Sequence, residues 1–493
     1  MTAQIDEETP LLAQQQNGNG KKKRTPLPWF QFSIVLFLQL AEPLTSQVIY
    51  PFAPQLMRDL DITGGDESRV GYYVGLMQSI FFLTQAFTVL HWSRISDSIG
   101  RKPVILTGLL GLSCSMYCFG LSRTFWGLVL SRSLNGALNG NIGVIKSMMA
   151  EMTDSTNISQ AYAYMPIAWS TGGTLGPIIG GSLSRPAEQF PHLFGKSEFL
   201  KKYPYFLPCA VPATFSLVAW VVTFLFLKET VPRPIPVKEF LGLKKETKSK
   251  SKIALAEEEE EEGAVVPTSD GQTGLEKPLS LRSLLTRRVV IAAGNYATLS
   301  LVDIAFRAVQ PLFLSTPIHM GGLGLPPATI GKLLSIFGVL NGVFQVFFFA
   351  QVNDYFGSRN LFIFGISSAF PAFAMFPFIN YLAREQGYSV FVWSAVLVQI
   401  VISIGISLSY GAIFIFISAA SPNRASLGAT NGLSQMGVSV MRSIGPAMTN
   451  SFFSLSVGKR YLGGNLVYYV LLAVVSLSIV NASMLPRKVW LTD

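Results

Sequence analysis

Residues 171–181 read TGGTLGPIIGG, with five glycines and one proline in a stretch that otherwise has the character of a buried segment. In water such a stretch would form a turn or a loop, because glycine and proline each destabilise a helix. No charged residue occurs between Gln160 and Ser184, however. The stretch therefore predicts a helix that is surrounded by lipid and by other helices.

The composition of the whole chain also indicates a membrane protein. Of its 493 residues, 49% are hydrophobic and only 13% are charged, whereas soluble proteins have about a quarter charged residues. The apolar residues form blocks of about twenty, the length that a helix needs to cross a bilayer. Twelve blocks lie near residues 30–53, 69–92, 103–121, 125–149, 160–183, 204–227, 289–315, 328–350, 360–382, 389–419, 427–456 and 465–485. We expect an all-α polytopic membrane protein with twelve transmembrane helices.

These blocks divide the chain into five parts. They are a disordered N-terminal tail (1–28), an N-terminal six-helix half (29–227), a linker (228–288), a C-terminal six-helix half (289–485) and a C-terminal tail (486–493). The linker contains the runs KKETKSKSK and EEEEEE, and such blocks of like charge do not form a buried core. We therefore expect a mostly disordered linker that tethers the two halves.

The distribution of lysine and arginine predicts the orientation in the membrane. The KKKR run at 21–24, the loop with Arg94, Arg101 and Lys102, and the Arg487–Lys488 end fall on one side when both termini are cytoplasmic. The tails and the linker are then cytoplasmic as well. The net charge of +10 is thus explained by topology, and no basic patch with exposed aromatic residues indicates a nucleic-acid partner.

The two halves repeat each other. Asp97 and Gly100 correspond to Asp354 and Gly357 at an offset of 257 residues, and Gly176–Pro177 corresponds to Gly445–Pro446 at an offset of 269. Because the two offsets are nearly equal, they indicate an internal repeat of six spans, and therefore two pseudo-symmetric halves. In transporters with such parallel repeats, the substrate site lies between the halves near the middle of the membrane.

Three motifs carry a resemblance to a known family. SRISDSIGRKP (93–103) resembles the major facilitator superfamily motif between spans two and three, with Asp97, Gly100, Arg101 and Lys102 matching and Ser93 where the family usually has glycine. LVLSRSLNG (128–136) resembles the fourth-span motif, with Arg132 in its basic position. The opening stretch, with Gly172, Gly176, Pro177, Gly180 and Gly181, is similar to the fifth-span motif of proton-coupled antiporters. The resemblance implies the major facilitator fold.

Two further stretches narrow the resemblance within this superfamily. AYAYMPIAWSTGGTLGPIIGG (161–181) and GVIKSMMAEMTD (143–154) are similar to the fungal and plant branch of zinc-induced-facilitator-like and multidrug-type antiporters. This resemblance implies a secondary transporter that exchanges a small organic solute for protons.

The glycines of the opening stretch predict a close helix contact. Gly172, Gly176 and Gly180 recur every four residues, so they share one helix face on which another backbone can approach closely. Pro177 permits a bend. We interpret this face as part of a gate and expect a leucine at Gly176 to impair transport more than folding. Plain packing is the alternative.

The loop after the second block is a second candidate gate. The resemblance implies that Asp97 meets Arg101 and the start of span eleven, which holds the cytoplasmic side shut. Glu151 and Asp154 follow span four and are expected partners of Arg101 or Lys102. Asp354, Gly357 and Arg359 are the counterparts in the second half. Charges that only set the topology are the alternative.

Ionisable residues within spans are energetically unfavourable, so their presence indicates a transport pathway. Five candidates are Glu42 before Pro43 in span one, Arg132 in span four, Asp303 and Arg307 in span seven, and Arg442 in span eleven. Burial of a carboxylate favours its protonated form, so Glu42 and Asp303 are candidate proton carriers.

The charges within the spans also bear on the solute. Asp303 and Arg307 lie four residues apart and can neutralise each other, which makes Glu42 the better proton carrier. Three arginines against two carboxylates leave one positive charge, which favours an anionic or zwitterionic solute.

These observations predict a proton antiporter for a small organic solute, acting in efflux or vacuolar loading, as a monomer in the bilayer. It is not an enzyme, and no cofactor or metal is expected, because there is no phosphate-binding loop and all three cysteines lie within predicted spans. A symporter or importer and a non-transporting receptor remain alternatives. Glu7 with Leu11 and Leu12 has the spacing of an acidic dileucine sorting signal, which favours the vacuolar membrane over the plasma membrane.

Overall fold

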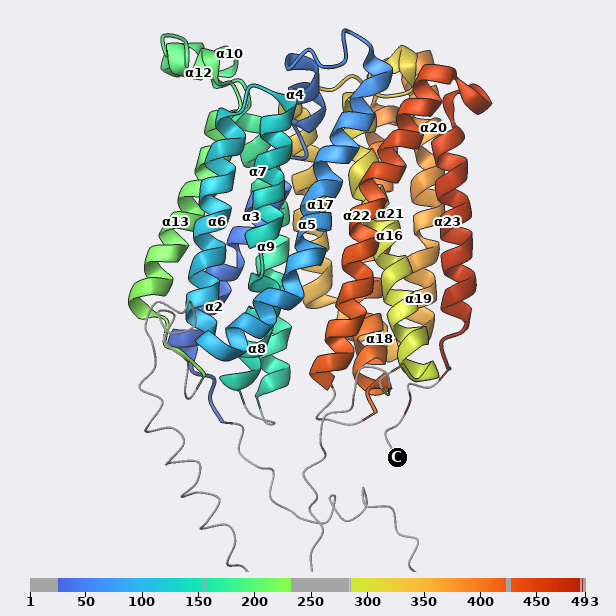
Figure 1. Cartoon of the computed structure of the whole chain (residues 1–493). Helices are drawn as coiled ribbons and strands as arrows, with labels where there is room; N and C mark the ends of the chain where they lie inside the picture. Colours follow the sequence, from blue (N-terminus) through green and yellow to red (C-terminus); the bar gives the residue numbers. More distant parts are fainter. Residues whose placement is uncertain are drawn as a thin grey trace, which may run out of the picture.

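The computed structural model describes residues 25–153, 157–231, 283, 285–422, 427–487 and 490. The dileucine residues Glu7, Leu11 and Leu12, residue Asp154 and most of the predicted linker lie outside these described residues. The described residues form a helical bundle in which α2 begins and α23 ends on the same face (Figure 1). We call this the terminal face and the other one the opposite face.

The first half contains α2 (Trp29–Gln39), α3 (Ala41–Gln47), α4 (Ala53–Asp59), η1 (Glu67–Arg69), α5 (Val70–Ile99), α6 (Arg101–Leu121), α7 (Phe125–Leu138), α8 (Asn141–Glu151), α9 (Ile158–Leu183), the short helices α10 (Pro186–Gln189), α11 (Pro191–Phe194) and α12 (Glu198–Lys202), and α13 (Phe206–Phe226). The second half contains α16 (Arg287–Ser315), η3 (Ile318–Met320), α17 (Pro327–Phe347), α18 (Phe349–Phe356), α19 (Ser358–Ser367), α20 (Ala369–Gln386), α21 (Val390–Ala420), α22 (Leu427–Lys459), η5 (Tyr461–Gly464) and α23 (Leu466–Ser483).

These helices account for the twelve predicted spans. Within the described residues, seven helices are long and apolar enough to cross a bilayer, or eight when the bent α5 is included. The other four spans are α2 with α3, α7 with α8, α9, and α22. The first two are divided into shorter helices, and α9 and α22 are rich in glycine, serine and threonine. Small and polar residues reduce the hydropathy of a span but allow close contact between helices.

Spans one, four and nine differ from the prediction, because each is divided where a single helix is expected; span nine divides at Ser368 between α19 and α20. Span one divides at Leu40 between α2 and α3. Span four divides at Asn139, whose φ of −86° and ψ of 74° are not helical. The side chains of α5 compensate for this second break. Trp92 Nε1 donates a hydrogen bond to the Ala137 carbonyl at 2.7 Å, and Gln85 Nε2 donates one to the Asn139 carbonyl at 3.4 Å.

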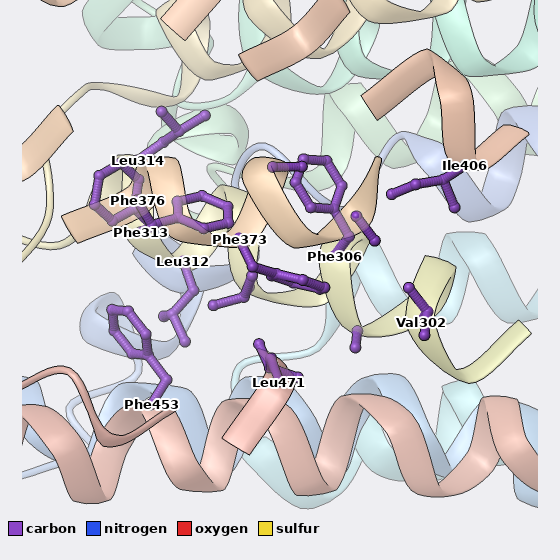
Figure 2. Packing of buried hydrophobic residues seen from close by; sticks show 14 of the residues in the cluster. Val302, Phe306, Leu312, Phe313, Leu314, Phe373, Phe376, Ile406, Phe453 and Leu471 are labelled. Carbon is purple, nitrogen blue, oxygen red and sulfur yellow. The ribbon is translucent and has the colours of Figure 1, made fainter. Parts of the chain in front are cut away.

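Aromatic rings fill the interior of the C-terminal half. Figure 2 shows Phe306 and Phe313 of α16 facing Phe373 and Phe376 of α20, with Leu471 of α23 nearby. The ring centroids of Phe313 and Phe376 lie 4.9 Å apart, and those of Phe306 and Phe373 lie 5.7 Å apart. Such edge-to-face packing of large apolar rings holds the half together as one unit.

The two halves meet along two equivalent pairs of helices, because α5 packs against α22 and α9 packs against α17. In each pair a proline carbonyl meets a glycine. A Cβ at Gly75 would lie 2.8 Å from the Pro446 carbonyl oxygen, and a Cβ at Gly331 would overlap the Pro177 carbonyl oxygen. Gly75 and Gly331 lie 256 residues apart, close to the 257-residue offset of the loops. These contacts confirm the internal repeat.

The contacts between the halves lie towards the opposite face. The Ala447 amide donates a hydrogen bond to Ser79 Oγ at 2.9 Å, and the backbone of Gly458 lies against Ser68. Towards the terminal face, the α22 side chains Met436 and Val440 are 49% and 39% exposed. Figure 1 shows α5 and α22 diverging in this direction. The structure is therefore closed on its opposite face.

Candidate functional site

Glu42 lies at the first turn of α3, directly after the break in span one. Its carboxylate is next to the side chains of Asn139 and Gln85, and it lies in the electrostatic field of Lys146 and Arg442. Asn139 is there because span four breaks at that residue. The two helix breaks therefore bring polar groups to the carboxylate, and α22 brings an arginine from the other half.

Lys146 is a sixth ionisable residue near the centre that the sequence analysis left out. It belongs to α8 and lies close to both Glu42 and Arg442. The signal was present in the sequence, because position 146 lies inside the predicted span 125–149. With Lys146 included, the central region carries four cationic side chains and two carboxylates, which increases its positive excess from one to two.

Asp303 has two hydrogen-bonded partners in the C-terminal half. Arg307 Nε donates to one carboxylate oxygen at 2.9 Å, and Tyr410 Oη donates to the other at 3.0 Å. Arg442 Nε donates to Ser300 Oγ, one turn earlier on α16, at 3.1 Å. The pairing of Asp303 with Arg307 that the sequence allows is therefore present.

Arg132 of α7 lies beside Tyr50 and against the ring of Phe81. The distance from its guanidinium carbon to the ring centroid is 4.6 Å, and its electrostatic neighbours are Tyr50 and Cys209. Tyr50 in turn lies within the electrostatic range of Arg307 and Arg442. All five ionisable residues predicted from the sequence therefore surround one central region, with Tyr50 between the charges of the two halves.

Gly172, Gly176 and Gly180 pack against α3 and its end, within the same half. A Cβ at Gly176 would lie 2.8 Å from the Cβ of Gln47, and one at Gly180 would overlap the Val48 carbonyl oxygen. The glycine face thus forms a close helix contact, but this contact does not join the two halves. The expectation for a leucine at Gly176 therefore changes, because such a leucine would strain the N-terminal half in both transport states.

Gly173 and Gly181 are the glycines of this stretch that contact the other half. A Cβ at Gly181 would overlap the Pro327 carbonyl oxygen and lie 3.0 Å from the Cα of Gly331 in α17. Two turns earlier on α9, the Thr174 carbonyl accepts a hydrogen bond from Ser335 Oγ at 2.8 Å. The helix α9 therefore contacts α3 with one face and α17 with another.

Comparison with protein families agrees with this architecture. Residues 35–446 match the family model described as Major Facilitator Superfamily. The chain belongs to this superfamily.

Two relatives illustrate its place in the superfamily. The chain is 29% identical over 465 residues to Protein ZINC INDUCED FACILITATOR-LIKE 1 of Arabidopsis thaliana. This match covers 93% of the chain and 92% of the relative. The chain is 27% identical over 512 residues to the major facilitator superfamily multidrug transporter mfsB of Aspergillus fumigatus, covering 92% and 83% respectively. These matches confirm the resemblance to fungal multidrug-type and plant zinc-induced-facilitator-like members.

A solved structure has the same fold. The structure described as a bacterial homologue of the human lysosomal transporter Spinster, inward-facing and unoccupied, has a TM-score of 0.64 to this chain at 14% sequence identity. The match covers 93% of this chain and 96% of the other. It confirms the major facilitator fold.

The superfamily loop motif forms an ion-paired cluster at the terminal face. Arg101 Nη1 lies 2.5 Å from Asp97 Oδ1, and Arg101 Nη2 lies 2.8 Å from Glu151 Oε1. Ser96 Oγ accepts a further hydrogen bond from Arg101 and donates one to the Ser93 carbonyl. Asp97 and Glu151 are thus partners of Arg101, and their gating role remains a prediction.

The contact of Asp97 with the start of span eleven, which the resemblance implies, stays a prediction, because residues 423–426 lie outside the described part of the chain. In the described part of the chain, the ion pairs and hydrogen bonds of Asp97 stay within its own half. This agrees with the divergence of α5 and α22 towards the terminal face.

The structure adds Glu229, which the sequence analysis did not single out. Its carboxylate accepts hydrogen bonds from the backbone amides of Arg101 at 2.8 Å and Lys102 at 3.0 Å, the first residues of α6. It also accepts hydrogen bonds from the amides of Thr230 and Val231. A negative charge at the start of a helix is stabilising. Glu229 therefore attaches the start of the linker to the loop motif.

We expect Glu229→Gln to lower the stability of the protein by about 1 kcal/mol, because the charge-assisted hydrogen bonds at the start of α6 become neutral. The midpoint of thermal unfolding in detergent should fall by a few degrees. Glu198→Gln is the matched control, because Glu198 is an exposed carboxylate that pairs with Lys201 at a helix start. An equal fall of the unfolding midpoint in both variants would show that the attachment of Glu229 to α6 does not stabilise the protein.

The equivalent loop of the second half is held differently. Arg359 Nε donates a hydrogen bond to the Leu485 carbonyl at 2.7 Å, and Nη2 donates to the Ser483 carbonyl at 3.1 Å. Gly357 has a φ of 77°, as Gly100 has a φ of 101°, so glycine is favoured in both loops. Asp354 is exposed. The second loop therefore binds the carbonyls at the end of α23 where the first binds carboxylates.

A polar cluster closes the opposite face. Arg58 binds both oxygens of Glu67 at 2.9 and 3.0 Å and also donates to the Ser315 carbonyl of the other half at 3.0 Å. Arg185 pairs with Asp59. Burial lowers the pKa of Arg185, but the hydrogen bonds and charge interactions with Asp59 and Tyr205 together outweigh this effect and the pKa is raised. Arg58 therefore joins the two halves.

Proposed function

We propose that this protein is a proton-coupled antiporter that moves a small organic solute across its membrane by alternating access. The terminal face is cytoplasmic in this proposal, so the solute leaves the cytosol, either into a vacuole or across the plasma membrane. One observation carries the proposal, namely that the Glu42 carboxylate of the first half lies within electrostatic range of Arg442 of the second half.

The coupling follows from electrostatics. Ionised Glu42 attracts Arg442 and thereby favours the arrangement in which the halves are close at mid-membrane, whereas protonated Glu42 does not. Such an interaction is stronger in the membrane interior than in water, because the local dielectric constant is lower. Protonation therefore changes the relative free energies of the two states, which is the requirement for coupling. The side chains of Asn139 and Gln85 supply polar neighbours for the ionised form of Glu42.

A transport assay in sealed vesicles with an imposed pH gradient tests the proposal. Vesicles with the terminal face outside and an acidic interior should accumulate a substrate from a panel of radiolabelled organic solutes, and a protonophore should abolish the accumulation. The reverse gradient driving accumulation would indicate a symporter. Transport that is indifferent to both the gradient and the protonophore would contradict proton coupling.

A further inference from the structure

Arg132 is buried without a hydrogen-bond acceptor. Its side chain is 5% exposed, and within the described residues Nε and Nη1 are enclosed and have no partner. The two arginines of spans seven and eleven do have partners, because Arg307 pairs with Asp303 and Arg442 donates a hydrogen bond to Ser300. An enclosed charge without a partner is strongly unfavourable. The site is therefore incomplete in the chain by itself.

The geometry around Arg132 leaves one side of the guanidinium for a ligand. The ring of Phe81 covers a face of the guanidinium at 4.6 Å. Nη2 is neither among the enclosed atoms nor hydrogen-bonded to a described residue, so it reaches open space. Nη2 is therefore the guanidinium nitrogen that a ligand oxygen can reach, and an oxyanion is the strongest acceptor for it. A neutral carbonyl oxygen can accept the same hydrogen bond but does not balance the buried charge, and a cationic group is repelled by it.

Asn135 supplies a second unsatisfied group beside the first. It lies three residues after Arg132 on α7, is 2% exposed, and its Oδ1 has no donor in the described part of the chain. Residues three apart lie on the same face of a helix. Two orphaned polar side chains on one face, close to Tyr50 and so to the central charges, point to a ligand group that is absent from the chain itself.

From these contacts we infer that Arg132 binds the carboxylate of the transported solute, which is therefore an organic anion. The inference rests on the proposed function for the transport step, but the binding itself does not depend on a proton gradient. Phe81 and Phe82 of α5 and Ile304 of α16 form a small buried cluster between the halves. The ring beneath Arg132 therefore belongs to a cluster that reaches the other half.

The test uses the purified full-length protein in detergent and two probes of equal shape, benzoate and benzamide. Benzoate should raise the thermal unfolding midpoint in a concentration-dependent way, and benzamide should do so much less. In Arg132→Gln the half-maximal benzoate concentration should rise by about tenfold or more, as expected for loss of a charge-assisted contact. Arg69→Gln is the control, because Arg69 is an exposed arginine that pairs with Asp66, and it should retain the benzoate response.

A second variant keeps the inference testable when Arg132→Gln fails to fold. Asn135→Asp places a carboxylate of the chain beside Arg132. It should raise the unfolding midpoint without any probe and abolish the response to benzoate. Equal responses to benzoate and benzamide in the wild type, or a benzoate response that survives in both variants, would overturn the inference. Wild-type benzoate binding without gradient-driven transport would instead contradict only the proposed antiport.

Discussion

Glu42→Gln is expected to reduce the accumulation of solute driven by a pH gradient at least about tenfold, while exchange of solute without a gradient persists. Glutamine has the shape of the protonated carboxyl group, so it retains the contacts with Asn139 and Gln85 but cannot release a proton. The halves can still alternate, because neutral Glu42 is one of the two states of the wild-type cycle. Uphill transport and counterflow in the same proteoliposomes measure the two activities separately.

Asp303→Asn is the matched comparison for Glu42→Gln. It also removes an ionisable carboxylate from a span, but it leaves Arg307 without its ion-pair partner at 2.9 Å. We therefore expect less folded protein and a loss of both uphill transport and exchange, because an unpaired buried charge is destabilising. If Glu42→Gln accumulates solute as the wild type does, Glu42 does not lie on the proton pathway.

Gly181→Leu is expected to shift the protein towards the state that is open at the opposite face. The added side chain meets backbone atoms of α17, including the Cα of Gly331 at 3.0 Å from the Cβ position, so α9 and α17 must separate there. Overpacking of this kind costs about 1–3 kcal/mol, and two transport states differ by only a few kcal/mol. A single cysteine at Ser68, which lies against Gly458 of the other half, should become about tenfold more reactive in a background without native cysteines.

Gly176→Leu is the control within the same helix. Its Cβ position lies 2.8 Å from the Gln47 side chain and 3.1 Å from the Val48 amide, so the strain falls inside the N-terminal half in both states. We expect less folded protein but no shift in the labelling of the cysteine at position 68. Increased labelling in Gly176→Leu, or unchanged labelling in Gly181→Leu, would contradict the division of the glycines between the two contacts.

The sequence identified most of the candidate site, because charge within an apolar span is visible without a structure. Glu42, Arg132, Asp303, Arg307 and Arg442 all surround the central region. Lys146 is as visible in the sequence as the other charged residues, although it lies near the end of its apolar block. Glu229 carried no such signal, since a carboxylate at the end of a span is ordinary in a membrane protein, and only its position at the start of α6 gives it a role.

Hydropathy, span length and motif order are local properties of the chain, so the lipid surroundings, the number of spans and the internal repeat can be predicted without a structure. Which helix surfaces contact each other follows only from the packing of the whole bundle. Gly172, Gly176, Gly180 and Gly181 look alike in the sequence, yet the first three contact α3 and the last contacts α17. A small residue shows that some backbone approaches closely, but the identity of that backbone depends on how all the helices pack together.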